Sequence, residues 1–355
     1  MNTHPRVRHS WLGPLAPSAQ LAGWIGFALA GQGCVGARST SSLPGPSPAD
    51  AAACRTLTPS AVGGPMPPAS TMVLRWLGTA NYELAYGDQV VLLDAYFDRG
   101  PRSRPIGVTA EAVRRADLIL VGHAHADHIA DAAAVARRTH ALVVGASSAI
   151  QVVQAAGLPI DQTRTVNGRG GEVLQFKGFT VEPVLAHHSI LQPTVLAKFR
   201  EALAAVDSGP TAAEAAAEAA IDARGSEDPT VGTEGTLAYV ITLDTGFRLI
   251  WLDSAGPITE EERTLMARIG RTDMAIVAYQ GQYLAERQVA TTLPLVKLFR
   301  PGLYLPAHHD ELAGLFLDIG VEPLLMAIRD ELPETKAIAP LYRTPVCLSA
   351  RPGSR

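Results

Sequence analysis

Short apolar runs separated by turn-forming residues dominate the chain from residue 72 onward. The runs at 72–78 and 81–97 are rich in β-branched and aromatic residues, and Gly87-Asp88 interrupts the second of them, which is typical of a β-hairpin. Further along, continuous apolar runs alternate with segments of helical periodicity. This alternation predicts a layered α/β protein in which helices cover packed sheets.

The later elements follow from the same pattern. Apolar runs of strand length predict buried strands at 117–122, 141–146, 179–186, 237–243, 247–252, 274–279 and 303–307. Helical periodicity predicts helices at 110–116, 129–139, 149–157, 258–269, 284–299 and 321–331.

The segment 190–234 interrupts this alternation, because it separates two expected strands by far more than an ordinary connection. Thr211 and Glu214 have the spacing of a capping box, and Gly225 closes the helical pattern that follows. Two interpretations remain open for the insertion. It is either a surface excursion or a lid beside a functional site, since it starts directly after His188.

The N-terminus has the pattern of an export signal. Two arginines precede the apolar run 21–31, which is too short to cross a bilayer as a helix, and Ala28–Ala30 supply an A-x-A cleavage site. We expect a signal peptide over residues 1–33 and a periplasmic protein, or a membrane-anchored lipoprotein if Cys34 is lipidated. The alternative is a cytoplasmic protein whose leader reflects a misassigned start.

Residues 34–70 are rich in Pro, Ser, Ala and Gly and lack periodicity, which predicts a flexible linker before a folded domain at 71–350. The three cysteines form no C-x-x-C pair, so a cysteine zinc site is not expected. A Cys34–Cys54 disulfide is disfavoured, because both residues lie in sequence without periodicity.

Composition narrows the class of partner. With 47% hydrophobic and 18% charged residues, the chain has the makeup of a folded protein with a substantial apolar interior. Its net charge of −4 argues against nucleic acid, which would favour a basic face. We expect a small-molecule or lipid-derived substrate, and the composition indicates no particular oligomeric state.

Histidine points to the chemistry. Seven of the ten histidines fall in three clusters, and the first cluster, at 123–128, also contains Asp127. Each cluster, like Asp253, directly follows an expected strand. In layered α/β folds the loops beyond the carboxyl ends of strands are where sites are built, so these groups are expected to share one site.

The residue types in this site are those that hold zinc, which binds neutral imidazole and carboxylate. His123 and His125 are two positions apart and point the same way in an extended loop, whereas Asp127 and His128 point elsewhere, so one stretch can serve two neighbouring metals. A buried cluster of imidazoles would be costly without a metal. The candidate ligands are His123, His125, Asp127, His128, Asp253, one of His187 and His188, and one of His308 and His309.

The string His123-Ala124-His125-Ala126-Asp127-His128 resembles the signature of the metallo-β-lactamase superfamily of binuclear hydrolases. The resemblance extends over about residues 72–345 through the strings WLGTANYEL, LLDAYF, LAHHS, WLDSAG and LPAHHDE, which follow in family order. Within the superfamily, the chain looks most like the branch of ascorbate-phosphate lactonase and N-acyl-phosphatidylethanolamine phospholipase D.

This resemblance implies an α/β fold of the four-layer αββα type, with the metals at its edge. It implies that His123, His125 and His188 hold one metal, that Asp127, His128 and His308 hold the other, and that Asp253 bridges them. The family spacing favours His188 over His187 and His308 over His309. Asp94 and Asp310 are placed to orient ligand imidazoles.

The implied activity is that of a hydrolase with two divalent ions, zinc in preference to manganese or iron. The ions would acidify a bridging water, and the resulting hydroxide would cleave an ester, lactone, amide or phosphodiester bond. Asp127 is expected to orient the nucleophile or carry its proton, and Tyr279, Tyr283 or the spare histidines of the two His-His pairs are candidates to contact the substrate oxyanion. The alternatives are a non-catalytic metal-binding envelope protein and a nucleic-acid-processing metallohydrolase.

Overall fold

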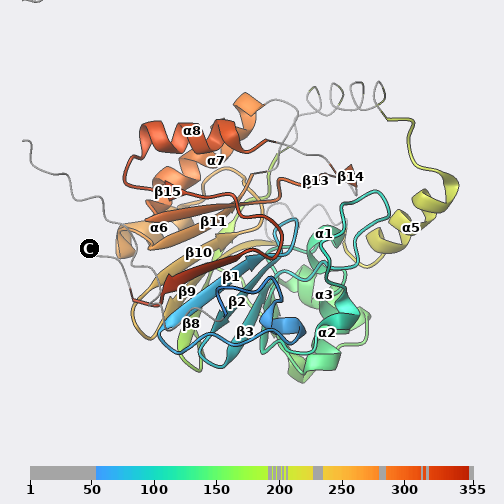
Figure 1. Ribbon diagram of the computed structural model, residues 1–355, viewed down its shortest axis with the longest axis horizontal. Coiled ribbons are helices and arrows are strands. Elements are labelled where there is room, and N and C mark those ends of the chain that lie inside the picture. Colours follow the sequence, from blue (N-terminus) through green and yellow to red (C-terminus); the bar gives the residue numbers. More distant parts are fainter. Residues whose placement is uncertain are drawn as a thin grey trace, which may run out of the picture. The chain divides into compact units, whose positions relative to one another are not determined.

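Two sheets of seven strands each form the framework of the protein, in the orders β16-β1-β2-β3-β4-β5-β6 (sheet A) and β15-β12-β11-β10-β9-β8-β7 (sheet B). The structure is a computed structural model that describes residues 53–190, 207–226, 235–279, 285–312, 315–316 and 320–351, and the single residues 194, 197, 201 and 204. Figure 1 shows how the two sheets lie against each other.

Sheet A begins as an antiparallel meander and continues with parallel strands. Its strands are β1 (Thr71–Trp76), β2 (Tyr82–Tyr86), β3 (Gln89–Leu93), β4 (Leu118–Leu120), β5 (Leu142–Gly145), β6 (Thr163–Thr165) and β16 (Pro345–Ser349). The β2–β3 turn passes through Gly87 with a φ of 57°, a left-handed conformation that suits glycine, so the predicted hairpin is confirmed.

Sheet B likewise has an antiparallel part and a parallel part. Its strands are β7 (Leu174–Phe176), β8 (Phe179–Ala186), β9 (Thr236–Leu243), β10 (Arg248–Leu252), β11 (Met274–Ala278), β12 (Leu303–Ala307) and β15 (Lys336–Ala337). Strands β7 to β10 are antiparallel, and β10, β11, β12 and β15 are parallel. Because β8 and β10 are both antiparallel to β9, the two end at the same edge of the sheet.

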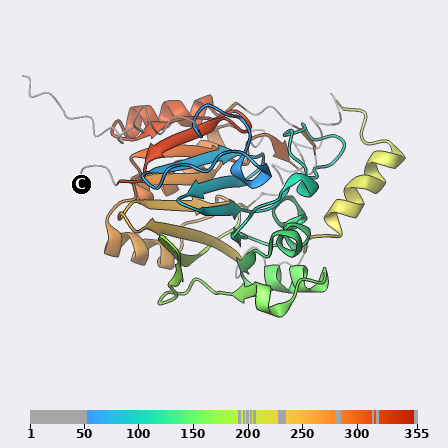
Figure 2. The ribbon, with the colours of Figure 1, turned by 60° about the horizontal axis from the view of Figure 1, so that its bottom comes forward.

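The apolar residues form three layers of core. One lies between the sheets and includes Leu74, Leu84 and Trp251. A second packs α2 (Ala132–Thr139) and α3 (Ser147–Ala155) on sheet A, and a third packs α6 (Glu260–Ile269), α7 (Ala285–Phe299) and α8 (Glu322–Glu331) on sheet B. The four-layer αββα sandwich is therefore confirmed, and Figure 2 shows the helices on either side of the sheets.

Several short elements complete the described chain: η2 (Ser60–Val62), η3 (Ala110–Ala112), η4 (Ile160–Gln162), α1 (Ala126–Ile129), α5 (Ala212–Asp222), β13 (Glu311–Leu312) and β14 (Leu315–Phe316). The helix predicted at 110–116 is wrong, since only one 3-10 turn forms and Val113 is already extended and buried. In the insertion, the capping box of Thr211 and Glu214 does begin a helix, α5.

The segment before β1 belongs to the fold, so the prediction of a flexible linker up to residue 70 is wrong for residues 53–70. Glu83 is fully buried, pairs with Arg75 at 2.9 Å and accepts hydrogen bonds from the backbone N–H groups of Ser60 and Ala61. The Arg75 guanidinium also donates to the carbonyl of Ala53. A buried carboxylate must be paired and hydrogen-bonded, and this segment supplies the donors.

A disulfide fastens the same segment to the last strand. Cys54 is bonded to Cys347 of β16, across 293 positions of sequence. This bond excludes the pairing of Cys54 with Cys34, which the sequence disfavoured. Residues 34–52, with Cys34, lie outside the described part of the chain, as does the expected signal peptide.

Candidate metal centre

Histidine and aspartate side chains gather where strands of the two sheets end. His123 follows β4, His188 follows β8, Asp253 follows β10 and His308 follows β12, in each case within three residues of the last strand position. α1 is a single turn that starts at Ala126, between the candidate ligands His125 and Asp127. The predicted meeting of distant clusters at one edge is thus what the fold produces.

The predicted ligands form three overlapping groups. In each group the candidate ligand atoms all lie within 4.8 Å of one another; the groups are His123, His125 and His188; His123, His128 and Asp253; and Asp127, His128 and His308. The first and third groups are the two sets that the family resemblance implies. Asp253 is grouped with one histidine of each set, as a bridging carboxylate would be.

The two His-His pairs are separated by the fold. His188 lies in the cluster, whereas His187 directs its Nδ1 toward the carbonyl oxygen of Pro257, 3.1 Å away. His308 is buried in the cluster, whereas His309 stacks on Trp76 with ring centroids 4.1 Å apart. The structure therefore brings His188 and His308, and not their neighbours, to the site.

Carboxylates fix the orientation of the imidazoles. Asp94 Oδ2 lies 2.6 Å from His128 Nδ1, and Asp94 Oδ1 accepts a hydrogen bond from the backbone of Gly122. Asp253 Oδ2 lies 2.6 Å from His123 Nδ1, and Asp127 Oδ2 lies 3.0 Å from His308 Nε2. The carboxylate on Nδ1 of His128 leaves its Nε2 lone pair available, which is how metal-binding histidines are commonly held.

Buried polar atoms without hydrogen-bond partners indicate whether a cation fits the cluster. Within the described residues, His128 Nε2 and Asp253 Oδ1 are buried and have no hydrogen-bond partner. An unsatisfied polar atom in a protein interior costs about 1–3 kcal/mol. Both residues belong to the group that contains His123, so a cation held by that group could be bound by these atoms. The donor set of imidazole nitrogens and carboxylate oxygens is one that zinc accepts.

Burial and charge set the protonation of the site. Burial lowers the pKa of His123 and His125 and lowers that of His188 to about 4, so these rings are neutral at pH 7, as metal binding requires. Burial would also lower the pKa of His128, but the carboxylates of Asp127, Asp94 and Asp253 raise it to about 10. The site thus concentrates negative charge around one imidazole.

The backbone at the site is held in unusual conformations. Asp94, His308 and Thr79 all have positive φ angles, of 62°, 56° and 47°. Such conformations cost about 1–3 kcal/mol each in non-glycine residues and cluster at functional sites. Thr79 accepts a hydrogen bond from the backbone N–H of His308 at 2.7 Å, so two of these positions support each other.

Asp310 has a different role from the one expected. Its carboxylate accepts hydrogen bonds from the backbone N–H of Thr79, from Arg99 and from the Tyr342 hydroxyl. It therefore holds the loop that supports His308 and not a ligand imidazole. Tyr279 also differs from expectation, because it is buried in the core between sheet B and its helices. Tyr283 lies outside the described residues.

Sequence reasoning missed two residues that lie close to the candidate ligands. Asp131 is buried, accepts hydrogen bonds from the backbone of Phe97 and Asp98, and pairs with Arg224 of the insertion. Asp131 lies only three positions after His128, so its proximity to the site could have been noticed. Arg224 could not be predicted, because the sequence pattern of the insertion does not show which face of its helix lies against the site.

Comparison with known proteins identifies the class. The model of the β-lactamase superfamily domain matches residues 89–309, which include all seven candidate ligands. The chain therefore belongs to this superfamily, the one that the string at 123–128 resembles. With its fold and its histidine-aspartate cluster, it stands among the metal-dependent hydrolases of the metallo-β-lactamase type.

Individual relatives agree with this class. A UPF0173 metal-dependent hydrolase of Cupriavidus necator is 27% identical over 267 residues, which is 73% of this chain and 82% of that protein. Igni18, a metallo hydrolase from Ignicoccus hospitalis, has a TM-score of 0.55 at 17% identity, covering 78% of this chain and 98% of its own. CmlA, a diiron β-hydroxylase from Streptomyces venezuelae, has a TM-score of 0.50 at 14% identity, covering 80% and 55%. The last two share the fold alone.

Proposed function

We propose that the protein is a binuclear hydrolase. His123, His125 and His188 would hold one divalent cation, Asp127, His128 and His308 would hold the second, and Asp253 would lie between them. The observation that carries this proposal is the division of the cluster into two complete three-ligand sets, with Asp253 grouped with one histidine of each. Zinc is the first choice, because catalytic zinc typically has three protein ligands of these types.

When bound, two such cations lower the pKa of a water and polarise a substrate oxygen. The chain's own contribution centres on Asp127, whose side chain is 30% exposed while those of Asp94 and Asp253 are fully buried. Although its partial burial acts to raise it, His128 and His308 hold the pKa of Asp127 well below its usual range, so its carboxylate is ionised. Asp127 can therefore accept a hydrogen bond from the attacking water and orient it.

This chemistry defines the class of bond that is cleaved but not the individual bond type. An ester, a lactone, an amide and a phosphodiester all present an electrophilic centre with an oxygen that a cation can polarise. A panel of these four substrate types, tested with zinc-loaded and manganese-loaded protein, decides among them. Turnover of none of them by fully loaded protein would contradict the hydrolase proposal and favour the alternative of a non-catalytic metal-binding protein.

Two metal ions per chain are expected in protein that is prepared without chelators. Elemental analysis should approach a stoichiometry of two, with zinc as the predominant metal. Asp127→Asn is measured beside the wild type. It weakens only one of the two proposed ligand sets, so the number of metal ions per chain should fall toward one. A fully occupied wild-type preparation with one ion per chain would contradict the binuclear model.

We further propose that the protein works outside the cytoplasm. The Cys54–Cys347 disulfide supports this, because disulfides persist in oxidising compartments and are rare in the cytosol. Among the described helices, none is both long enough and apolar enough to cross a membrane.

Mass spectrometry of the natively expressed protein tests this localisation. A chain that starts at Gly31 would indicate soluble export, and a lipidated Cys34 would indicate tethering at a membrane surface. An intact Met1 in the cytosolic fraction would contradict export, and it would leave the proposed metal centre unaffected.

A further inference from the structure

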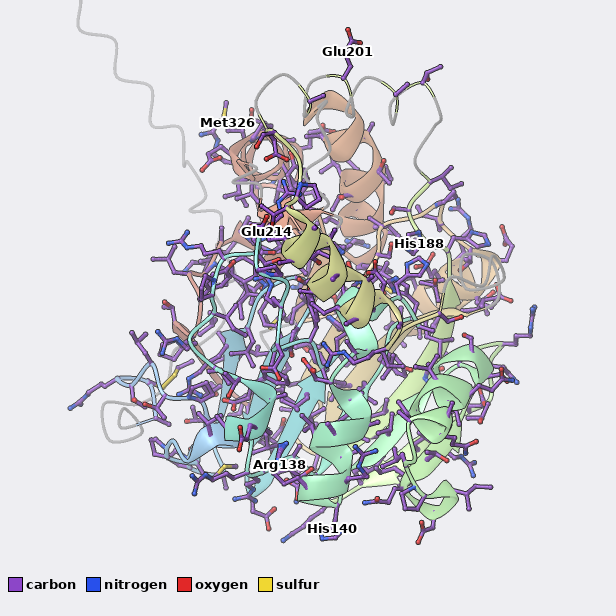
Figure 3. All side chains as sticks on the ribbon, turned by 90° about the vertical axis from the view of Figure 1, so that its right-hand side faces the viewer. Arg138, His140, His188, Glu201, Glu214 and Met326 are labelled. Atoms are coloured by element: carbon purple, nitrogen blue, oxygen red, sulfur yellow. A yellow bond between two sulfur atoms is a disulfide. The ribbon has the colours of Figure 1, made fainter. Side chains whose placement is uncertain are left out.

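The insertion between β8 and β9 meets the metal centre at both of its ends. His188 lies directly before it, and the insertion leads into β9, where the backbone N–H of Leu237 donates to the carbonyl of Gly122. Helix α5 lies between, beside α1, at the edge of the sandwich that Figures 1 and 2 show on the right. Figure 3 looks onto this edge and labels Glu214 of α5 together with His188.

Helix α5 packs on the ligand-bearing turn through one apolar side chain. Ile221 is 8% exposed and forms a small cluster with Tyr96, Ala126 and Ala130, separate from the three main cores. Ala126 lies between the candidate ligands His125 and Asp127, and Ala130 follows the same turn. Ile221 therefore covers the outer side of α1.

Arg224 adds an ion pair at the end of the helix. Its guanidinium lies 2.7 Å from Asp131 Oδ1, and the other Asp131 oxygen accepts hydrogen bonds from Phe97 and Asp98. Asp131 is 1% exposed, so its charge requires a partner. The Asp131 backbone donates to the carbonyl of Ala95, whose own N–H donates to the carbonyl of His128, so the pair is connected to a candidate ligand by two hydrogen bonds.

The residues after Arg224 touch the turn directly. A Cβ added at Gly225 would lie 2.4 Å from the backbone nitrogen of Ala126, so only glycine allows this approach. The backbone N–H of Ser226 donates to the carbonyl of Ala124, which lies between His123 and His125. These contacts fasten the insertion to the loop that carries four of the seven candidate ligands.

We propose that the end of helix α5 and the residues after it, 221–226, form a brace for the metal centre, with Arg224 as its main positioning residue. Arg224 acts through Asp131, and Ile221 and Gly225 act through Ala126, to keep the turn at 124–128 in the conformation in which its ligand atoms converge. Residues 221–226 of the insertion are then neither a bare surface excursion nor a lid that must open. This inference rests on the proposed metal centre.

The test compares Arg224→Ala with Arg102→Ala. Arg102 pairs with Asp207 at the other end of the described insertion, so its loss removes an ion pair of the same segment without touching the ligand turn. Zinc affinity is measured by chelator competition, and the unfolding of the metal-free protein is measured by denaturant. Hydrogen exchange is followed over residues 124–131.

For Arg224→Ala we expect zinc affinity to fall about 10-fold, the lower end of the range for loss of a group that orients metal ligands. Exchange over 124–131 should be faster in the metal-free protein. Arg224→Lys should recover part of the affinity, because it keeps the charge beside Asp131. Arg102→Ala should leave both affinity and exchange at wild-type values.

Unchanged exchange over 124–131 in Arg224→Ala would overturn the brace, whether or not the protein binds zinc. A loss of stability with unchanged zinc affinity would also overturn it, because that result describes a purely structural contact. If Arg224→Ala does not fold, Ile221→Ala is judged by the same two readouts. A wild-type protein that binds no zinc would instead contradict the proposed function, while the exchange measurement would still decide on the brace.

Discussion

Replacing His188 with alanine is expected to abolish the binding of one metal and nearly all hydrolytic activity. The loss should exceed about 100-fold, the upper end of what removal of an orienting group costs, because here a ligand itself is lost. The matched control is His187→Ala, since His187 is the preceding residue and its Nδ1 contacts the carbonyl of Pro257, outside the cluster. That variant should retain two metals and most of the activity.

The second His-His pair offers an independent test of the same geometry. His308→Ala should lose the other metal, whereas His309→Ala removes a ring that stacks on Trp76 and should affect stability more than metal content. Metal analysis and turnover are measured on all four variants. Loss of metal from His187→Ala with retention in His188→Ala would show that the ligand assignment is wrong by one position.

Among the variants considered, loss of the disulfide is expected to cause the largest decrease in the free energy of unfolding. Removing a native disulfide typically costs about 2–5 kcal/mol, and a bridge that closes a long loop lies toward the upper end in the chain-entropy model. The 293 positions between Cys54 and Cys347 make this loop nearly as long as the folded unit. Cys347→Ala should therefore lower the denaturant midpoint strongly.

The variant is compared with wild type in the presence and absence of reductant, with Cys34→Ser in both backgrounds to prevent exchange. Reductant should destabilise the wild type and leave Cys347→Ala unchanged. Metal content should remain at the wild-type level, because the bridge joins the edge strand β16, whereas the candidate ligands follow β4, β8, β10 and β12. Equal midpoints for the two proteins without reductant would contradict a stabilising bridge.

The core of the candidate site could be predicted from sequence because each cluster of candidate ligands follows a strand. Apolar runs locate strand ends to within a few residues, and the topology of layered folds brings such ends together. The same reasoning failed for Asp310, whose position next to a His-His pair suggested contact with an imidazole. Its actual partners, Thr79 and Arg99, are more than 200 positions away in sequence and leave no local pattern.

The parts of the fold that escaped prediction depend on similar distant contacts. Residues 53–70 have the composition of a linker, yet the buried pair of Arg75 and Glu83 and the bond to Cys347 bind them to the domain. Arg224 pairs with Asp131 across 93 positions, and helical periodicity says nothing about which exposed arginine finds a buried carboxylate. Local patterns specify elements well, but they do not specify single pairings between them.

The covalent bond between the two ends of the fold also determines how the protein responds to mechanical force. β1 and β16 pair from Thr71 with Ser349 to Arg75 with Pro345, so tension on the chain ends would open this pair one residue at a time from a single end, like a zipper. With the bridge intact, that tension passes from Cys54 to Cys347 through the sulfur atoms and bypasses everything between them. In the oxidised protein, residues 55–346 therefore form a loop that tension on the chain ends does not extend, and the histidine-aspartate centre lies within this unloaded loop.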